Sequence, residues 1–181
     1  MKNGRNIKVY KKLIIKTLKR MFVIIGLLYI CLSYFNKNYV INVTPSLPIG
    51  IYKLEKIDNK INKGDIVLFT AKENVRKFML DRGYISKRIK SFIKRVEGVE
   101  GDKILVSNSL EINNKKIKDS LPNKDLFGRD LFKKNGEYLL KKDEYFLVGD
   151  KKYSFDSSYM GIIKRNQIKY KAKIILEWGS K

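Results

Sequence analysis

The segment Asn42–Gly50, NVTPSLPIG, places a serine hydroxyl where it could act as a nucleophile. Ser46 stands between Pro45 and Pro48, two of the chain's three prolines, and proline rings hold a backbone extended and stop a helix from continuing. The chain contains no histidine, which rules out a Ser-His-Asp triad, a Cys-His dyad and a histidine-ligated zinc site. A nucleophilic Ser46 therefore needs a different base. The alternative is an ordinary linker, since serine beside proline is common in turns.

The segment 91–102, SFIKRVEGVEGD, offers such a base. Side chains alternate between the two faces of a strand, so Lys94 shares a face with Phe92 and Val96. A lysine among apolar side chains loses solvation, which lowers its pKa and makes the neutral amine accessible near neutral pH. A Ser-Lys dyad requires such an amine. The same alternation also fits a lysine that reaches from a sheet edge into solvent.

A third segment, 148–161, reads VGDKKYSFDSSYMG. It contains several hydroxyl and acidic residues between two glycines. On its own, this composition is typical of a surface loop. Together, however, the three segments resemble the type I signal peptidase superfamily, the S26 serine peptidases. KRVEGVEGD (94–102) is similar to the family segment that supplies the base, and GDKKYSFDSSYMG (149–161) to the segment that closes the site.

The first segment resembles one branch of that superfamily. Its pattern, Asn-x-Thr-x-Ser-x-Pro-x-Gly-x-Tyr over residues 42–52, is similar to the conjugative-transfer (TraF-type) peptidases, as is RGYI at 82–85. The resemblance implies a signal-peptidase-like β fold and a membrane-anchored endopeptidase. Its substrate would be an exported precursor, a conjugative pilin, which is cleaved and in some members cyclised. A general type I signal peptidase with broad substrates and a non-catalytic anchored assembly module are the alternatives.

The resemblance also implies roles for individual residues. Ser46 matches the nucleophile and Lys94 the general base. Thr44 matches a hydroxyl that joins the Ser46 backbone N–H in the oxyanion hole. Ser154 matches the hydroxyl that orients the lysine, and Asp156 an acid that braces the site.

One position departs from the family pattern. The family usually has an arginine that pairs with the acid at Asp156, but this chain has Ser158 there. Arg95 and Lys164 are the candidate replacements. The resemblance implies neither a metal nor another cofactor.

The N-terminal region predicts a membrane anchor. Residues 1–20 contain eight basic residues and no acidic one, and residues 21–35, MFVIIGLLYICLSYF, are uncharged. Fifteen helical residues span about 22 Å, against about 30 Å of hydrocarbon core, and snorkelling basic side chains could make up the difference. We expect a cytoplasmic tail at 1–20, a single transmembrane helix at 21–35 in contact with lipid, and an extracytoplasmic domain at 36–181. A cleaved signal peptide is the alternative, although no Ala-x-Ala-like site follows.

The composition argues against a nucleic-acid-binding protein and against a protein built on disulfides or a thiolate metal site. The net charge of +22 would suit nucleic acid, but only eight of the 40 basic residues are arginine, the usual residue for bidentate phosphate and base contacts. We therefore expect no nucleic-acid partner. The single cysteine, Cys31, lies in the apolar stretch, so neither a disulfide framework nor a thiolate metal site is expected.

The elements that must position the site are mainly strands. Apolar, β-branched runs after turn signals predict strands at 63–69, 100–106, 143–150 and 172–178. Residues 110–117 predict a hairpin that turns at Asn113-Asn114. Residues 72–83 predict a short peripheral helix that Gly83 ends. Residues 119–142 are less regular and could form an inserted lobe. The fold class is mainly β.

Overall fold

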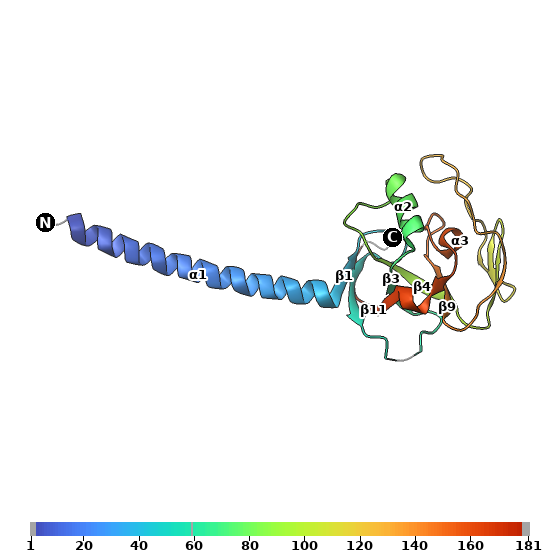
Figure 1. Ribbon diagram of the computed structural model, residues 1–181, viewed down its shortest axis with the longest axis horizontal. Coiled ribbons are helices and arrows are strands. Elements are labelled where there is room, and N and C mark those ends of the chain that lie inside the picture. Colours follow the sequence, from blue (N-terminus) through green and yellow to red (C-terminus); the bar gives the residue numbers. More distant parts are fainter. Residues whose placement is uncertain (1–2, 59, 179–181) are drawn as a thin grey trace. The chain divides into compact units, whose positions relative to one another are not determined.

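The computed structural model describes residues 3–58 and 60–178, and the chain divides into two units, residues 1–39 and 40–181. Helix α1 (Asn3–Asn38) makes up the first unit and is drawn as one continuous helix in Figure 1. Residues 1 and 2 of the predicted basic tail, and the last three residues of the predicted peptidase domain, lie outside the described residues.

Helix α1 does not support the predicted crossing at residues 21–35. Its large apolar side chains are exposed, for example Phe22 at 79% and Tyr29 at 73%. However, no helix among the described residues is both long enough and apolar enough to cross a membrane. The physical reason is the short uncharged stretch, because basic residues precede residue 21 and Lys37 follows soon after residue 35.

The second unit is mainly β, as predicted. Its larger sheet has seven strands in the order β1-β2-β11-β3-β4-β9-β10. The bounds are β1 (Tyr39–Asn42), β2 (Gly50–Glu55), β3 (Ile66–Phe69), β4 (Phe92–Gly98), β9 (Glu144–Val148), β10 (Ile163–Lys164) and β11 (Ile168–Glu177). Strands β3, β9 and β11 confirm three predicted strands, although β11 begins earlier than residue 172. Strands β2, β3, β4 and β11 are joined by antiparallel pairings.

A second sheet has four strands in the order β7-β6-β5-β8. They are β5 (Lys103–Val106), β6 (Leu110–Ile112), β7 (Lys115–Lys118) and β8 (Gly136–Leu139). The β6–β7 hairpin is confirmed, since Asn113 and Asn114 both have positive φ angles, 52° and 64°, as a two-residue hairpin turn requires.

Two short helices flank the sheets. Helix α2 (Glu73–Asp81) confirms the predicted helix, and Gly83 follows it with φ 70° and donates its N–H to the Leu80 carbonyl. Helix α3 (Ser157–Met160) is a single turn, and the side chain of Asp156 at its start accepts the Ser158 N–H. A 3₁₀ turn, η1 (Arg165–Gln167), connects β10 to β11.

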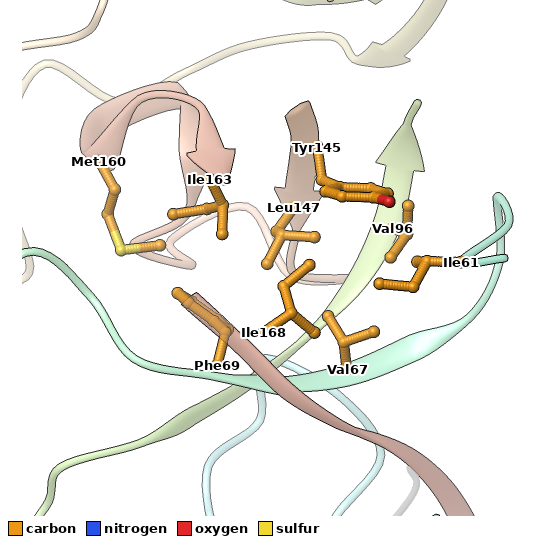
Figure 2. Close-up of a cluster of buried hydrophobic side chains, with 9 residues drawn as sticks. All are labelled: Ile61, Val67, Phe69, Val96, Tyr145, Leu147, Met160, Ile163 and Ile168. Atoms are coloured by element: carbon orange, nitrogen blue, oxygen red, sulfur yellow. The ribbon is translucent and has the colours of Figure 1, made fainter. Parts of the chain in front are cut away.

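Strand β9 is buried on both faces. Tyr145 and Leu147 belong to the apolar cluster of the larger sheet, which Figure 2 shows. Phe146 and Val148 point the other way and pack with the side chains of the smaller sheet. Successive side chains of one strand therefore join the two sheets into one unit. A third cluster, which includes Leu47 and Tyr52, lies under the loop that carries Ser46.

Candidate active site

The loop between β1 and β2, which carries Ser46, is held by one buried amide side chain. Asn42 is 6% exposed, and its Nδ2 donates to the backbone carbonyls of Thr44, Leu47 and Pro48 at 2.9, 3.1 and 3.0 Å. The first acceptor precedes Ser46 and the other two follow it. The amide therefore fixes the loop on both sides of the serine. In the sequence, Asn42 is only one position of a pattern, and no local signal predicts this role.

Tyr52 and Gly50 secure the same loop from β2. The Tyr52 hydroxyl donates to the Pro48 carbonyl at 2.7 Å, and the side chain is fully buried. Burial raises the pKa of Tyr52 to about 12, so the hydroxyl keeps the proton that it donates. A Cβ on Gly50 would collide with the Leu176 carbonyl of β11. The Asn, Pro, Gly and Tyr positions of the pattern therefore all help to fix the conformation of this loop.

Lys94 is buried in the middle of β4. Its side chain shares a face with Phe92 and Val96, as predicted, and Val67 of β3 lies directly opposite. The residue is 7% exposed. Loss of solvation lowers the pKa of Lys94 from 10.5 to about 8, although the negative charge of Asp156 opposes the shift.

Four of the five predicted site residues line one cavity. Thr44, Ser46, Lys94 and Ser154 border a space of about 370 Å³. Thr44 Oγ1 lies 3.2 Å from Ser46 Oγ and donates to Asn42 Oδ1 at 2.9 Å. Because a hydroxyl has one hydrogen, Ser46 is the donor in its contact with Thr44. Among the described residues, no hydrogen bond joins Ser46 Oγ directly to Lys94 Nζ.

The segment 149–154 packs directly against the serine loop. The Asp150 N–H donates to the Ser46 carbonyl at 2.7 Å. A Cβ on Gly149 would collide with Ser154 Oγ and lie 3.0 Å from the Ser46 carbonyl oxygen, so only glycine fits between them. Ser154 Oγ is buried and has no hydrogen-bond partner within the described part of the chain. Its hydroxyl is therefore available to a group in the cavity.

Asp156 lies behind the cavity and is fully buried. Its carboxylate accepts the backbone N–H groups of Gly149 and Ser158 at 3.2 and 3.1 Å. It also forms an ion pair of 2.7 Å with Nζ of Lys118, whose side chain is 9% exposed. The acid thus braces both ends of the segment 149–158.

The cation beside Asp156 corrects the prediction that Arg95 or Lys164 would provide it. Arg95 instead forms two hydrogen bonds with the carboxylate of Asp150, at 3.1 and 3.2 Å. Lys118 comes from β7 in the other sheet, 38 positions before the acid. No local sequence signal connects the two residues, because only the fold brings them together.

The wall of the cavity is mostly apolar. Its apolar lining includes Met79, Ile85, Phe92, Leu126, Phe127, Leu131, Phe155, Tyr159 and Met160. An ionic cluster supports the part of the wall between 125 and 131. Asp125 accepts from the Tyr84 hydroxyl at 2.6 Å and from Arg129 Nε at 2.7 Å, and Arg82 lies 3.5 Å away. RGYI (82–85) therefore contacts the region where the sequence predicts an inserted lobe.

Within residues 3–58 and 60–178, no three His, Cys, Asp or Glu side chains gather closely enough to hold an ion.

Comparison with known proteins gives one consistent family. Residues 14–178 match the family described as signal peptidase, peptidase S26. The plasmid transfer protein TraF of Escherichia coli is 30% identical over 148 residues, which cover 76% of this chain and 82% of that protein. The conjugal transfer protein TraF of Agrobacterium tumefaciens (strain 15955) is 26% identical over 131 residues, covering 68% and 73%.

A solved signal peptidase I from Enterococcus faecalis V583 aligns with 62% of this chain and 97% of its own, at 18% identity and a TM-score of 0.38. The family match covers most of the chain, and the TraF relatives confirm the resemblance to the conjugative-transfer branch. The chain therefore belongs to the peptidase S26 family and is a serine peptidase of the signal-peptidase type.

Proposed function

We propose that this chain is a serine endopeptidase with a Ser46-Lys94 dyad that processes an exported precursor, a conjugative pilin. One observation carries the dyad: Ser46 lines the same cavity as a buried lysine whose pKa is lowered to about 8. A lysine with that pKa has an appreciable neutral fraction near pH 7 to 8, which a general base requires. The pilin substrate rests on the TraF relatives, whose names refer to plasmid and conjugal transfer.

The reaction begins with a proton transfer. Neutral Lys94 takes the proton of Ser46 Oγ as that oxygen attacks the scissile carbonyl, and an ammonium group and a tetrahedral oxyanion result. Ser46 must turn from Thr44 toward Lys94 for this step. Catalytic hydrogen bonds are often long in the free enzyme and tighten when substrate binds, so the free arrangement is compatible with the dyad.

The oxyanion would be held by the Ser46 backbone N–H and the Thr44 hydroxyl. The hydrogen of that hydroxyl now lies on Asn42 Oδ1, so it must rotate toward the substrate. Asn42 Oδ1 also accepts the Thr44 backbone N–H, at 3.2 Å, which keeps Thr44 in place while its hydroxyl turns. One such donor is typically worth about 10²–10³ in rate.

Ser154 and Asp156 would act on the lysine. Ser154 Oγ lacks a partner within the described part of the chain and borders the cavity, so it can hydrogen-bond Lys94 Nζ and orient it. Asp156 holds the segment that carries Ser154 and does not line the cavity itself.

Collapse of the intermediate breaks the C–N bond. Lys94 returns its proton to the leaving amine, and an ester on Ser46 remains. Water resolves the ester in simple cleavage, whereas an amine of the same product would resolve it in cyclisation. Both outcomes use the same residues.

Membrane association completes the proposal. Helix α1 carries exposed apolar side chains between Met21 and Tyr34, and basic residues such as Lys16, Lys19 and Arg20 precede them. Apolar insertion combined with attraction to anionic lipid would hold the enzyme near emerging precursors. A full crossing with a cytoplasmic N-terminus and an extracytoplasmic catalytic unit stays a prediction. Flotation of the chain with vesicles, with and without anionic lipid, measures the association.

Mass spectrometry of a co-expressed candidate pilin precursor tests the function. Wild type should trim the precursor, whereas Ser46→Ala and Lys94→Ala should not. The exposed residues Ser107 and Lys53 lie away from the cavity, so Ser107→Ala and Lys53→Ala are matched controls that should retain trimming. A product lighter by one water than the trimmed chain would identify cyclisation.

Other outcomes would change the assignment. Cleavage of a generic exported preprotein, with the pilin precursor untouched, would identify a broad signal peptidase. Failure to process either substrate would favour a non-catalytic module. Trimming by Ser46→Ala would contradict the dyad directly.

A further inference from the structure

Lys118 joins the smaller sheet to the candidate active site. It is the last residue of β7, and its side chain is 9% exposed. Its ammonium group makes two contacts, one to Asp156 Oδ2 at 2.7 Å and one to the Lys151 carbonyl at 3.2 Å. Both acceptors belong to the segment 149–158, which packs against Ser46. A residue outside every recognised motif therefore contacts the site's supporting segment twice.

The charge of Lys118 matters because Asp156 is fully buried. Apart from Lys118, the carboxylate is held by two backbone N–H groups. A buried carboxylate without a cation is strongly destabilising. It would also favour a positive charge on any nearby titrating group, and Lys94 is such a group. The charge of Asp156 raises the pKa of Lys94, whereas the charge of Lys118 lowers it.

The other charges around Lys94 have partners of their own. Asp150 also favours protonation of Lys94, but Arg95 forms a bidentate pair with it. Asp125 lines the cavity and is paired with Arg129.

Lys151, which also lines the cavity, is exposed. Of the charged side chains that act on Lys94, Lys118 is thus the cation that offsets Asp156.

We propose that Lys118 is a positioning residue of this peptidase: its ion pair with Asp156 holds the segment 149–158 against Ser46 and keeps Asp156 from stabilising a proton on Lys94. This inference rests on the proposed role of Lys94 as the base. It gives the smaller sheet a supporting part in the chemistry, through a contact between side chains that are 38 positions apart.

Charge substitutions test the inference. Lys118→Met removes the cation, Lys118→Arg keeps it, and Lys116→Met is the matched control, since Lys116 is an exposed lysine of the same strand. Trace acetylation with acetic anhydride across a pH series, read by peptide mass spectrometry, gives the titration midpoint of the Lys94 amine without any substrate. The pH-rate profile for the candidate pilin precursor gives the catalytic midpoint.

Lys118→Met should raise both midpoints by about one pH unit, because a nearby uncompensated carboxylate shifts a titrating group by that order. The rate below the midpoint should then fall about tenfold, with recovery at higher pH. Lys118→Arg and Lys116→Met should match wild type. An unchanged Lys94 midpoint in folded Lys118→Met would overturn the inference.

A second comparison covers the case in which Lys118→Met fails to fold. Asp156→Asn should lower the Lys94 midpoint, and adding Lys118→Met in that background should raise it again, with no buried carboxylate left unpaired. Equal midpoints in these two variants would also overturn the inference. Other results would show that the proposed dyad itself is wrong, rather than the role of Lys118. In that case Lys94 in wild type would titrate near its ordinary pKa, or Lys94→Ala would remain active.

Discussion

Raising the pH from 7 to 9 should strongly accelerate this enzyme. The proposed base is Lys94, which is 7% exposed and has a pKa lowered from 10.5 to about 8 by burial. Only the neutral amine can accept the proton of Ser46. The reaction should therefore follow the deprotonation of a single group, with activity present above the pKa and lost below it.

The size of the effect follows from the pKa. With a midpoint near 8, about a tenth of Lys94 is neutral at pH 7 and about nine tenths at pH 9, so kcat/KM should rise about tenfold. Below pH 7 the rate should fall about tenfold for each further pH unit. Lys94→Arg should have no measurable activity at any of these values, since a guanidinium stays protonated.

The assay is cleavage of the candidate precursor at a concentration far below KM, with circular dichroism at each pH to verify that the chain stays folded. A flat profile between pH 6 and 9 would refute the role of Lys94 as the base. A midpoint near 10.5 would refute the argument that burial tunes the lysine.

Three substitutions test other parts of the site. Asn42→Ala removes the amide that holds the serine loop. It should lower kcat/KM about ten- to a hundredfold in the cleavage assay, mainly through kcat rather than KM, because the nucleophile is misplaced. Gly149→Ala forces Ser154 and the Ser46 carbonyl apart and should abolish cleavage, while far-UV circular dichroism shows that the sheets remain. Lys94→Met should raise the free energy of unfolding by about 3 kcal/mol near pH 7, because the buried charge costs about 1.4 kcal/mol per unit of its pKa shift. That gain should be complete below pH 8 and disappear as the pH rises from 8 to 10.5, which denaturant titrations at several pH values can measure; an increase in the gain with pH would contradict the sign.

Features with a local signal could be predicted from the sequence. The Asn113-Asn114 turn has the backbone that its residue types favour, and Gly83 ends α2 because glycine tolerates a positive φ. Strand alternation placed Lys94 on one face with Phe92 and Val96, but alternation alone fitted a lysine that reaches into solvent equally well. The convergence of Ser46, Lys94, Thr44 and Ser154 on one cavity came from the family resemblance, because their sequence separation says nothing about distance.

Features that depend on the fold could not be predicted. Lys118 reaches Asp156 only because the two sheets pack together, and 32 of the chain's 40 basic residues are lysine, so nothing marks this one. The role of Asn42 depends on three carbonyls that a bent loop turns toward it. The predicted membrane crossing rests on an uncharged run of fifteen residues, which is short for a bilayer, and no helix among the described residues is both long enough and apolar enough to span one.

The two-sided burial of β9 limits how far this peptidase could be reduced to a smaller enzyme. A shortened chain that lacked residues 103–139 would retain Ser46, Lys94, Ser154 and Asp156 in its sequence. It would nevertheless expose Phe146 and Val148, which are 1% and 4% exposed in the intact chain, at a cost of about 1.5–3 kcal/mol for each side chain. A chimera that transplants this site to another scaffold should therefore carry both sheets across as one piece.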